Sequence, residues 1–157
     1  MWYLKLILVL VFAFVLYQDF KTRLVYWFLY PMIGILAFLL QTNAVPLSVA
    51  LINCGINLFF VSSILFISFL YVKFRKLKFK NTVGIGDVLF FIFIACTFAI
   101  ITFLVLFVFS LLFSLILHFI FSHKKEQDTV PLAGYMSLFF CVVYLASFYN
   151  DTFLYAY

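Results

Sequence analysis

Charged side chains are scarce in this chain: Asp, Glu, Lys and Arg make up 10% of its 157 residues, whereas hydrophobic residues make up 69%. A soluble globular domain is nearer half apolar, so the composition excludes that class. The apolar residues form whole segments of about 20 residues, the length that crosses a bilayer. We therefore expect the lipid bilayer to surround the chain, and we interpret the net charge of +5 as membrane topology, with no nucleic acid as a partner.

The sequence also lacks any cysteine motif typical of metal binding or redox chemistry. Cys54, Cys96 and Cys141 lie singly in three different apolar segments, with no CxxC pair and no His at ligand spacing. We expect all three to be small buried hydrophobes, and we predict neither a metal site nor a cofactor. The chain contains no internal repeat, so residues 1–157 are expected to form a single membrane-embedded domain.

The apolar segments predict an all-α polytopic membrane protein. They occupy about residues 2–17, 25–40, 46–72, 88–122 and 130–149. No small-x-small cleavage site follows the first segment, so we expect it to be retained as a helix and not removed as a signal peptide. The second segment is interrupted by Pro31 and Gly34, and residues 41–43 form an uncharged turn. In the third, Asn53 and Asn57 share a face that we expect to pack between helices.

The stretch 88–122 contains no Asp, Glu, Lys or Arg. It is too long for one ordinary spanning helix and just long enough for two short ones with a turn near residues 97–102. Two helices here bring the total to six and place nine of the ten basic residues, all except Lys5, on one side of the membrane. Since cytoplasmic loops collect Lys and Arg, we expect six spanning helices in the cytoplasmic (inner) membrane, with both termini outside.

Acidic residues number only five, and two of them stand out. Glu126 and Asp128 share a polar loop with two lysines, and Asp151 lies in the C-terminal tail. Asp19 ends the first apolar run, and Asp87 opens another within Gly84-Ile85-Gly86-Asp87. A carboxylate near hydrocarbon costs several kcal/mol unless it is hydrated, paired or neutralised, so its presence suggests a use. The charge pattern puts both aspartates at the cytoplasmic boundary, where they can face each other.

Two facing carboxylates cannot both ionise cheaply, so they share one proton near neutral pH. One can then deprotonate a water while the other polarises a peptide carbonyl, which is the division of labour in aspartic proteolysis. The flanking Gly84 and Gly86 allow close backbone approach or a positive φ. The alternative is structural: Asp87 caps its helix, and Asp19 pairs with Lys21 or Arg23 at the interface.

The Gly84-Ile85-Gly86-Asp87 tetrapeptide at the start of a membrane helix resembles the signature of the GxGD intramembrane aspartic proteases. The segment from Asp19 through Lys21 and Arg23 to Val25 is similar to the type IV prepilin peptidase branch, which includes the archaeal preflagellin peptidases. The segment 130–135, with Pro131 and Gly134, resembles that branch's third motif. The likeness covers essentially the whole chain, with the three motifs in the family's order.

This resemblance implies an aspartic endopeptidase with Asp19 and Asp87 as its catalytic pair. Its substrates would be prepilin-like membrane proteins, cut after a short basic leader at the cytoplasmic membrane face. The chain departs from the family at Tyr26, where Pro is common, and at Leu89, where Lys is common. The N-terminal region with two CxxC pairs and methyltransferase activity is absent, which implies a minimal form without zinc and without N-methylation. His118 and His123 lie near the same boundary, and we expect no role for either.

A second class of function remains open. The chain could be a non-catalytic relative that acts as a membrane assembly factor, or a small proton-coupled carrier with the two aspartates as a relay. A relay would favour carboxylates near the midplane of the membrane, whereas these two lie at helix ends. The peptidase interpretation is therefore favoured.

Overall fold

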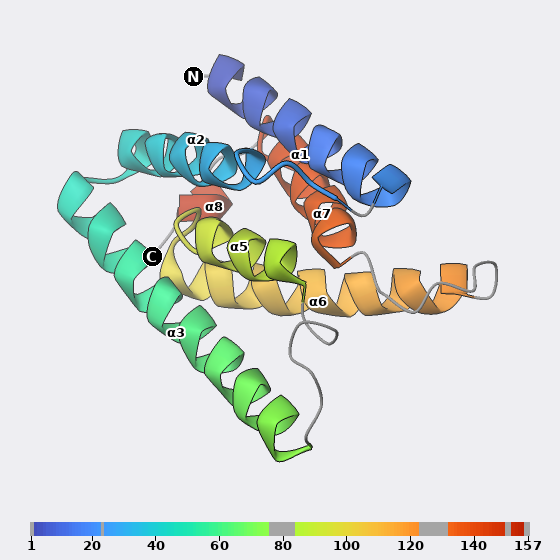
Figure 1. Cartoon of the computed structure of the whole chain (residues 1–157). Helices are drawn as coiled ribbons and strands as arrows, with labels where there is room; N and C mark the ends of the chain where they lie inside the picture. The colour runs from blue at the N-terminus through green and yellow to red at the C-terminus, as the bar shows by residue number, and fades with distance from the viewer. Residues whose placement is uncertain (1, 23, 76–83, 123–131, 150–151, 156–157) are drawn as a thin grey trace.

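The structure, a computed structural model, describes residues 2–22, 24–75, 84–122, 132–149 and 152–155, and these are helical apart from short connections (Figure 1). The elements are α1 (Trp2–Thr22), α2 (Leu29–Ala44), α3 (Leu47–Phe74), α5 (Ile85–Ile94), α6 (Ile100–Ser122), α7 (Leu132–Ala146) and the single turn α8 (Thr152–Tyr155). The expected all-α class is confirmed for these residues. Glu126, Asp128, Asp151, Arg23, Pro131 and His123 lie outside them.

Three of these helices are long and apolar enough to cross a membrane: α1, α3 and α6. The other apolar helices, α2, α5 and α7, have between 10 and 17 residues. At about 1.5 Å per residue, α5 measures only about 15 Å, roughly half the hydrocarbon thickness. The described helices also expose many large apolar side chains, such as Phe59 at 76% and Phe119 at 69%. Both observations fit a membrane protein with three helices of spanning length.

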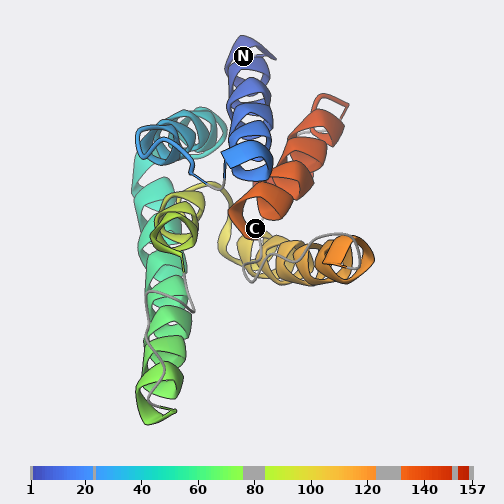
Figure 2. The same cartoon turned by 45° about the vertical axis from the view of Figure 1, so that its right-hand side comes forward.

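The core lies where α1, α5 and α7 meet. The helices α1 and α7 share the most extensive interface, while α2 lies against α1 and α5. The helix α3 packs on α5 and α6 through its N-terminal half, and its C-terminal half extends away from the other helices (Figures 1 and 2). Aromatic rings fill the core: the ring of Phe12 stacks 6.1 Å from Phe140 and 5.9 Å from Tyr144, and Phe98 stacks 5.5 Å from Tyr144.

Two helix boundaries differ from the sequence prediction. The first helix continues beyond residue 17 to Thr22, so that Asp19 lies within a helix and not in the polar connection after it. The second is not interrupted by Pro31 and Gly34; both lie inside α2. Pro31 is the third residue of this helix, where the backbone N–H would have no intrahelical acceptor, so proline costs no hydrogen bond there.

Residues 88–122 contain two helices of unequal length joined by residues 95–99, as expected, but only α6 is long enough to span a membrane. Asn57 on α3 fastens this turn, because its Nδ2 donates to the carbonyls of Ala95 at 3.0 Å and Phe98 at 3.1 Å. Asn53 is also buried, at 3% exposure. The expectation that this pair packs between helices therefore holds.

The expectation that all three cysteines are small buried hydrophobes was wrong, because each is half-buried and two of them are bonded to each other. Cys54 on α3 forms a disulfide with Cys96 in the turn between α5 and α6, and Cys141 on α7 is a free thiol. Cysteines 42 positions apart in different apolar segments carry no pairing signal in the sequence. Only the packing of α3 against this turn brings the two together.

Candidate active site

Asp19 and Asp87 meet at the N-terminus of α7. The Gly134 amide donates a 2.7 Å hydrogen bond to Oδ2 of Asp19, and the Ala133 amide donates one of 2.9 Å to Oδ1 of Asp87. These are the second and third residues of α7, whose N–H groups have no acceptor within their own helix. The positive end of the helix dipole also favours negative charge at this position. Three helix ends, the last turn of α1 and the first turns of α5 and α7, thus form one site (Figure 1).

The two carboxyl groups are close. Consecutive backbone nitrogens in a helix lie roughly 3 Å apart, so the two bonded carboxylate oxygens are separated by at most about 9 Å. The Asp87 carboxyl interacts electrostatically with Asp19, and the Gly84 backbone also hydrogen-bonds it. Asp19 is 7% exposed, whereas Asp87 is half-buried. Asp87 is therefore the more accessible carboxyl group of the two, and Asp19 lies deeper within the protein.

Glycine is required at this site for close approach. A Cβ on Gly134 would lie 2.7 Å from Oδ2 and 3.0 Å from Cβ of Asp19, and a Cβ on Gly86 would lie 2.6 Å from the hydroxyl oxygen of Tyr30. The distances of 2.7 Å and 2.6 Å are shorter than nonbonded atoms adopt. Gly84 has φ −67°, so the alternative of a positive φ beside Asp87 does not apply to it. The lack of a side chain at Gly86 and Gly134 therefore allows Tyr30 and Asp19 to contact the backbone of α5 and α7.

Tyr30 is a site residue that the sequence reasoning missed. It is the second residue of α2 and is 2% exposed, and its hydroxyl lies against Gly86. It interacts electrostatically with both Asp19 and Asp87. Its ring packs edge-on against Phe90, 6.4 Å between centroids. Nothing in the sequence separates it from the other tyrosines among the ten in the chain, because its place depends on how α2 packs against α5.

The connection after α1 is held by side chains of its last turns. Oε1 of Gln18 accepts a 3.1 Å hydrogen bond from the Tyr26 amide, and the Thr22 hydroxyl donates to the carbonyls of Gln18 and Leu24. These bonds satisfy backbone groups where the helix ends, so that the chain can turn into α2. They fix the turn of α1 that carries Asp19.

The remaining candidates make contacts of other kinds. Lys21 is exposed and donates a 3.0 Å hydrogen bond to the Tyr17 hydroxyl one turn earlier. His118 on α6 is half-buried beside Phe119, with ring centroids 6.4 Å apart. Leu89 packs against the apolar core. Among the described residues no three His, Cys, Asp or Glu side chains gather as metal ligands would.

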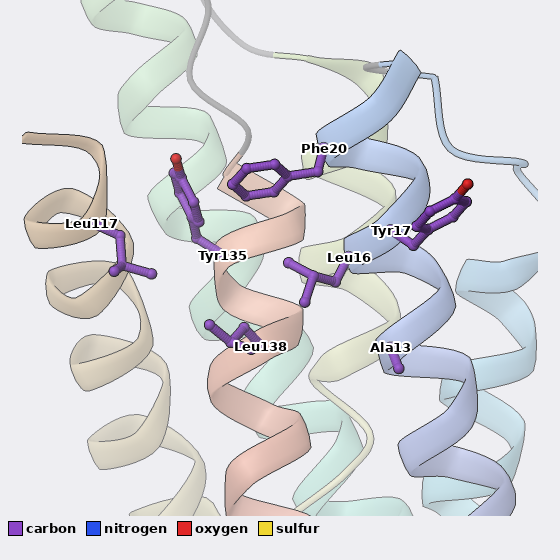
Figure 3. A pocket seen from close by; sticks show the side chains of 7 residues that line it. All are labelled: Ala13, Leu16, Tyr17, Phe20, Leu117, Tyr135 and Leu138. Carbon is purple, nitrogen blue, oxygen red and sulfur yellow. The ribbon is translucent and has the colours of Figure 1, made fainter. Parts of the chain in front are cut away.

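An apolar groove of about 450 Å³ lies between α1, α6 and α7 (Figure 3). It is lined by Ala13, Leu16, Tyr17, Phe20, Leu117, Tyr135 and Leu138. Phe20 follows Asp19 in the sequence, and Tyr135 follows Gly134. These two rings meet edge-on, 5.7 Å between centroids, at the end of the groove nearest the site. The groove thus offers apolar surface along α1 and α7, starting at the turns that carry Asp19 and Gly134, although neither carboxyl group lines it.

The arrangement combines a carboxyl pair, a buried phenol and helix N-terminal amides at the edge of an apolar bundle. Such a pair can share one proton, with one carboxylate acting as a base toward water and the other acting as an acid. The two backbone amides hold both side chains in fixed orientations, which is the role of supporting groups around a reactive pair.

No protein-family model, no curated protein and no solved structure matches the chain. The likeness to the prepilin peptidases is therefore one of short motifs, and the function is argued from the residues and their geometry.

Proposed function

We propose that this protein is an intramembrane aspartic endopeptidase that removes the short basic leader of prepilin-like membrane proteins. The observation that supports it most directly is the convergence of Asp19 and Asp87, from helices far apart in the sequence, on neighbouring amides of α7. A carboxylate that only caps a helix does not need a second carboxylate beside it, whereas two carboxylates that share a proton must lie close together. The adjoining groove supports the substrate class, because it offers apolar surface for the membrane segment that follows a leader.

In this mechanism one carboxylate removes a proton from water, which attacks the peptide carbonyl, while the other donates a proton to the carbonyl oxygen. The tetrahedral intermediate then collapses, the C–N bond breaks, and the proton held by the first carboxylate goes to the leaving amine. Tyr30 interacts electrostatically with both carboxyl groups, so we expect its phenol to influence which of them holds the shared proton.

Charge substitution tests this proposal. With a substrate that carries a basic leader before an apolar helix, Asp19→Asn and Asp87→Asn should each lower the cleavage rate by about 10²–10⁴-fold or more, because each removes one partner of the acid–base pair. The double variant should be no worse than either single one, since the pair acts as a unit. Asp128→Asn is the matched control and should cleave normally. Substantial cleavage by Asp87→Asn would exclude the aspartic mechanism.

The same hydrogen bonds favour a second candidate, a non-catalytic membrane assembly factor. A carboxylate that accepts hydrogen bonds from first-turn amides is also a helix cap, and loss of a cap costs about 0.5–2 kcal/mol of stability. In this case Asp19→Asn and Asp87→Asn would lower the melting temperature only. The unmutated protein would insert normally and cleave nothing.

For the orientation, we propose six membrane helices, of which α1, α3 and α6 have full spanning length and α2, α5 and α7 are shorter, with the aspartates on the cytoplasmic side and both termini outside. The position of the disulfide supports this, because Cys96 follows the opposite end of α5 from Asp87 and disulfides persist in oxidising compartments. A reporter fused after Lys76 should be cytoplasmic, and one fused after Tyr157 external. Two reporters on the same side would contradict six spans.

A further inference from the structure

Lys5 is a buried cation at the far end of α1 from the aspartates. It is 6% exposed, and its Nζ donates a 3.0 Å hydrogen bond to the carbonyl of Ser147, the residue after α7. The same ammonium lies 5.6 Å from the ring centroid of Phe148. Burial of a charge is costly unless it is paired. A helix C-terminus offers both unpaired carbonyls and the negative end of the helix dipole, so Lys5 lies where a buried cation is stabilised.

The helix α1 therefore holds α7 at both ends, each time with the charge that the dipole favours. Asp19 accepts from the Gly134 amide at the N-terminus, and Lys5 donates to Ser147 at the C-terminus. At about 1.5 Å per residue, the two charged side chains are about 21 Å apart along α1, and their two partners are about 20 Å apart along α7. The lengths match, as an antiparallel pair in a single register requires.

Contacts between these ends keep the same register. Sγ of Cys141 lies 3.9 Å from the Val9 carbonyl oxygen, and the rings of Phe12 and Phe140 stack at 6.1 Å. A thiol is a weak hydrogen-bond donor and ring stacking is only loosely directional, so these two contacts resist a small sliding of one helix along the other only weakly. The two charge-assisted hydrogen bonds at the ends are directional and define a length.

We propose that Lys5 is a positioning residue for Asp19: it fixes the axial register of α1 against α7 that presents the Asp19 carboxylate beside Asp87. A slip of one helical turn, about 5.4 Å, would break both end contacts and withdraw Asp19 from the Gly134 amide. Lys5 is about 21 Å from Asp19 along α1, so it acts only through the position of the helix. The effect on catalysis rests on the proposed peptidase function, whereas the effect on register does not.

The test compares Lys5→Met, which removes the donor and the charge at similar size, with Lys5→Arg, which keeps both. Lys73→Met is the matched control, because Lys73 is an exposed lysine in the last turn of α3. Cleavage of a prepilin-like substrate gives kcat and KM. The register is read from the alkylation rate of Cys141, the one cysteine of the chain's three outside the disulfide, whose sulfur lies against Val9 of α1.

We expect Lys5→Met to lower kcat about tenfold with KM nearly unchanged, because a displaced carboxylate reacts slowly while substrate still binds. Alkylation of Cys141 should become several-fold faster. Lys5→Arg should restore both values to near those of the unmutated protein, and Lys73→Met should change neither. If Lys5→Met does not fold, Lys5→Gln, which keeps a donor without the charge, is judged by the same measurements.

Unchanged kcat and unchanged alkylation in Lys5→Met would overturn the proposal, as would Lys5→Arg behaving like Lys5→Met. If the unmutated protein cleaves nothing and Lys5→Met still accelerates alkylation of Cys141, the peptidase function fails while the role of Lys5 in the register stands.

Discussion

The two ends of the helix bundle are held in different ways. At the aspartate end, where α1 finishes and α5 and α7 begin, carboxylates bind backbone amides. At the opposite end, a disulfide joins Cys54 to Cys96, and Asn57 bonds two carbonyls of the same turn. A covalent bond stays closed, whereas a carboxylate can exchange an amide for water or a peptide. The disulfide end is thus suited to be the scaffold, and the aspartate end to be the part that reacts.

Among changes that leave both carboxylates in place, the largest expected effect comes from crowding the aspartate end. Gly134→Ala places a methyl group 2.7 Å from Oδ2 of Asp19, so the carboxylate must move. We expect cleavage to fall by about 100-fold or more, since a misplacement of about 1 Å can cost that much. Gly55→Ala, where a Cβ meets nothing within 4 Å, is the control and should retain activity. Normal cleavage by Gly134→Ala would mean that the position of Asp19 does not matter.

Removal of the disulfide tests the opposite end. The paired change Cys54→Ala and Cys96→Ala should lower the free energy of unfolding by about 2–4 kcal/mol, seen as a lower midpoint in thermal or denaturant unfolding. Cleavage by the protein that remains folded should stay within about twofold of normal, because the carboxylates are held elsewhere. Cys141→Ala, which removes the free thiol, controls for the loss of sulfur. A large loss of activity at full folding would show that the two ends are coupled.

The smallest expected change in free energy concerns Tyr30, whose phenol interacts electrostatically with both carboxyl groups. Tyr30→Phe keeps the ring against Phe90 and removes only the hydroxyl. We expect about tenfold slower cleavage, which corresponds to the loss of about 1.4 kcal/mol of interaction with the carboxyl pair. Tyr71→Phe, on an exposed tyrosine of α3, should have no effect. If Tyr30→Phe leaves the cleavage rate unchanged, the hydroxyl plays no part in cleavage and Tyr30 contributes only packing.

The sequence predicted the aspartate end better than the disulfide end. Asp19 and Asp87 were identified because a carboxylate beside apolar segments is visible in composition alone, and the uncharged stretch after Asp87 predicted two helices. The extension of α1 to include Asp19 was missed, because residues 18–22 are polar and their helical state depends on burial of Gln18 and Asp19. Tyr30 was missed because a tyrosine in a membrane helix is ordinary until its neighbours are known.

The sequence by itself determined the helical class and the membrane setting, because both follow from which residues are apolar and how long their runs are. It also singled out the two carboxylates, since charge is rare enough in this chain for each one to be conspicuous. Only the tertiary structure decided that Cys54 meets Cys96, that Lys5 reaches Ser147, and that both carboxylates bind the start of α7. These pairings depend on the register and direction of packed helices, which are set by side-chain shapes acting across long separations in the sequence.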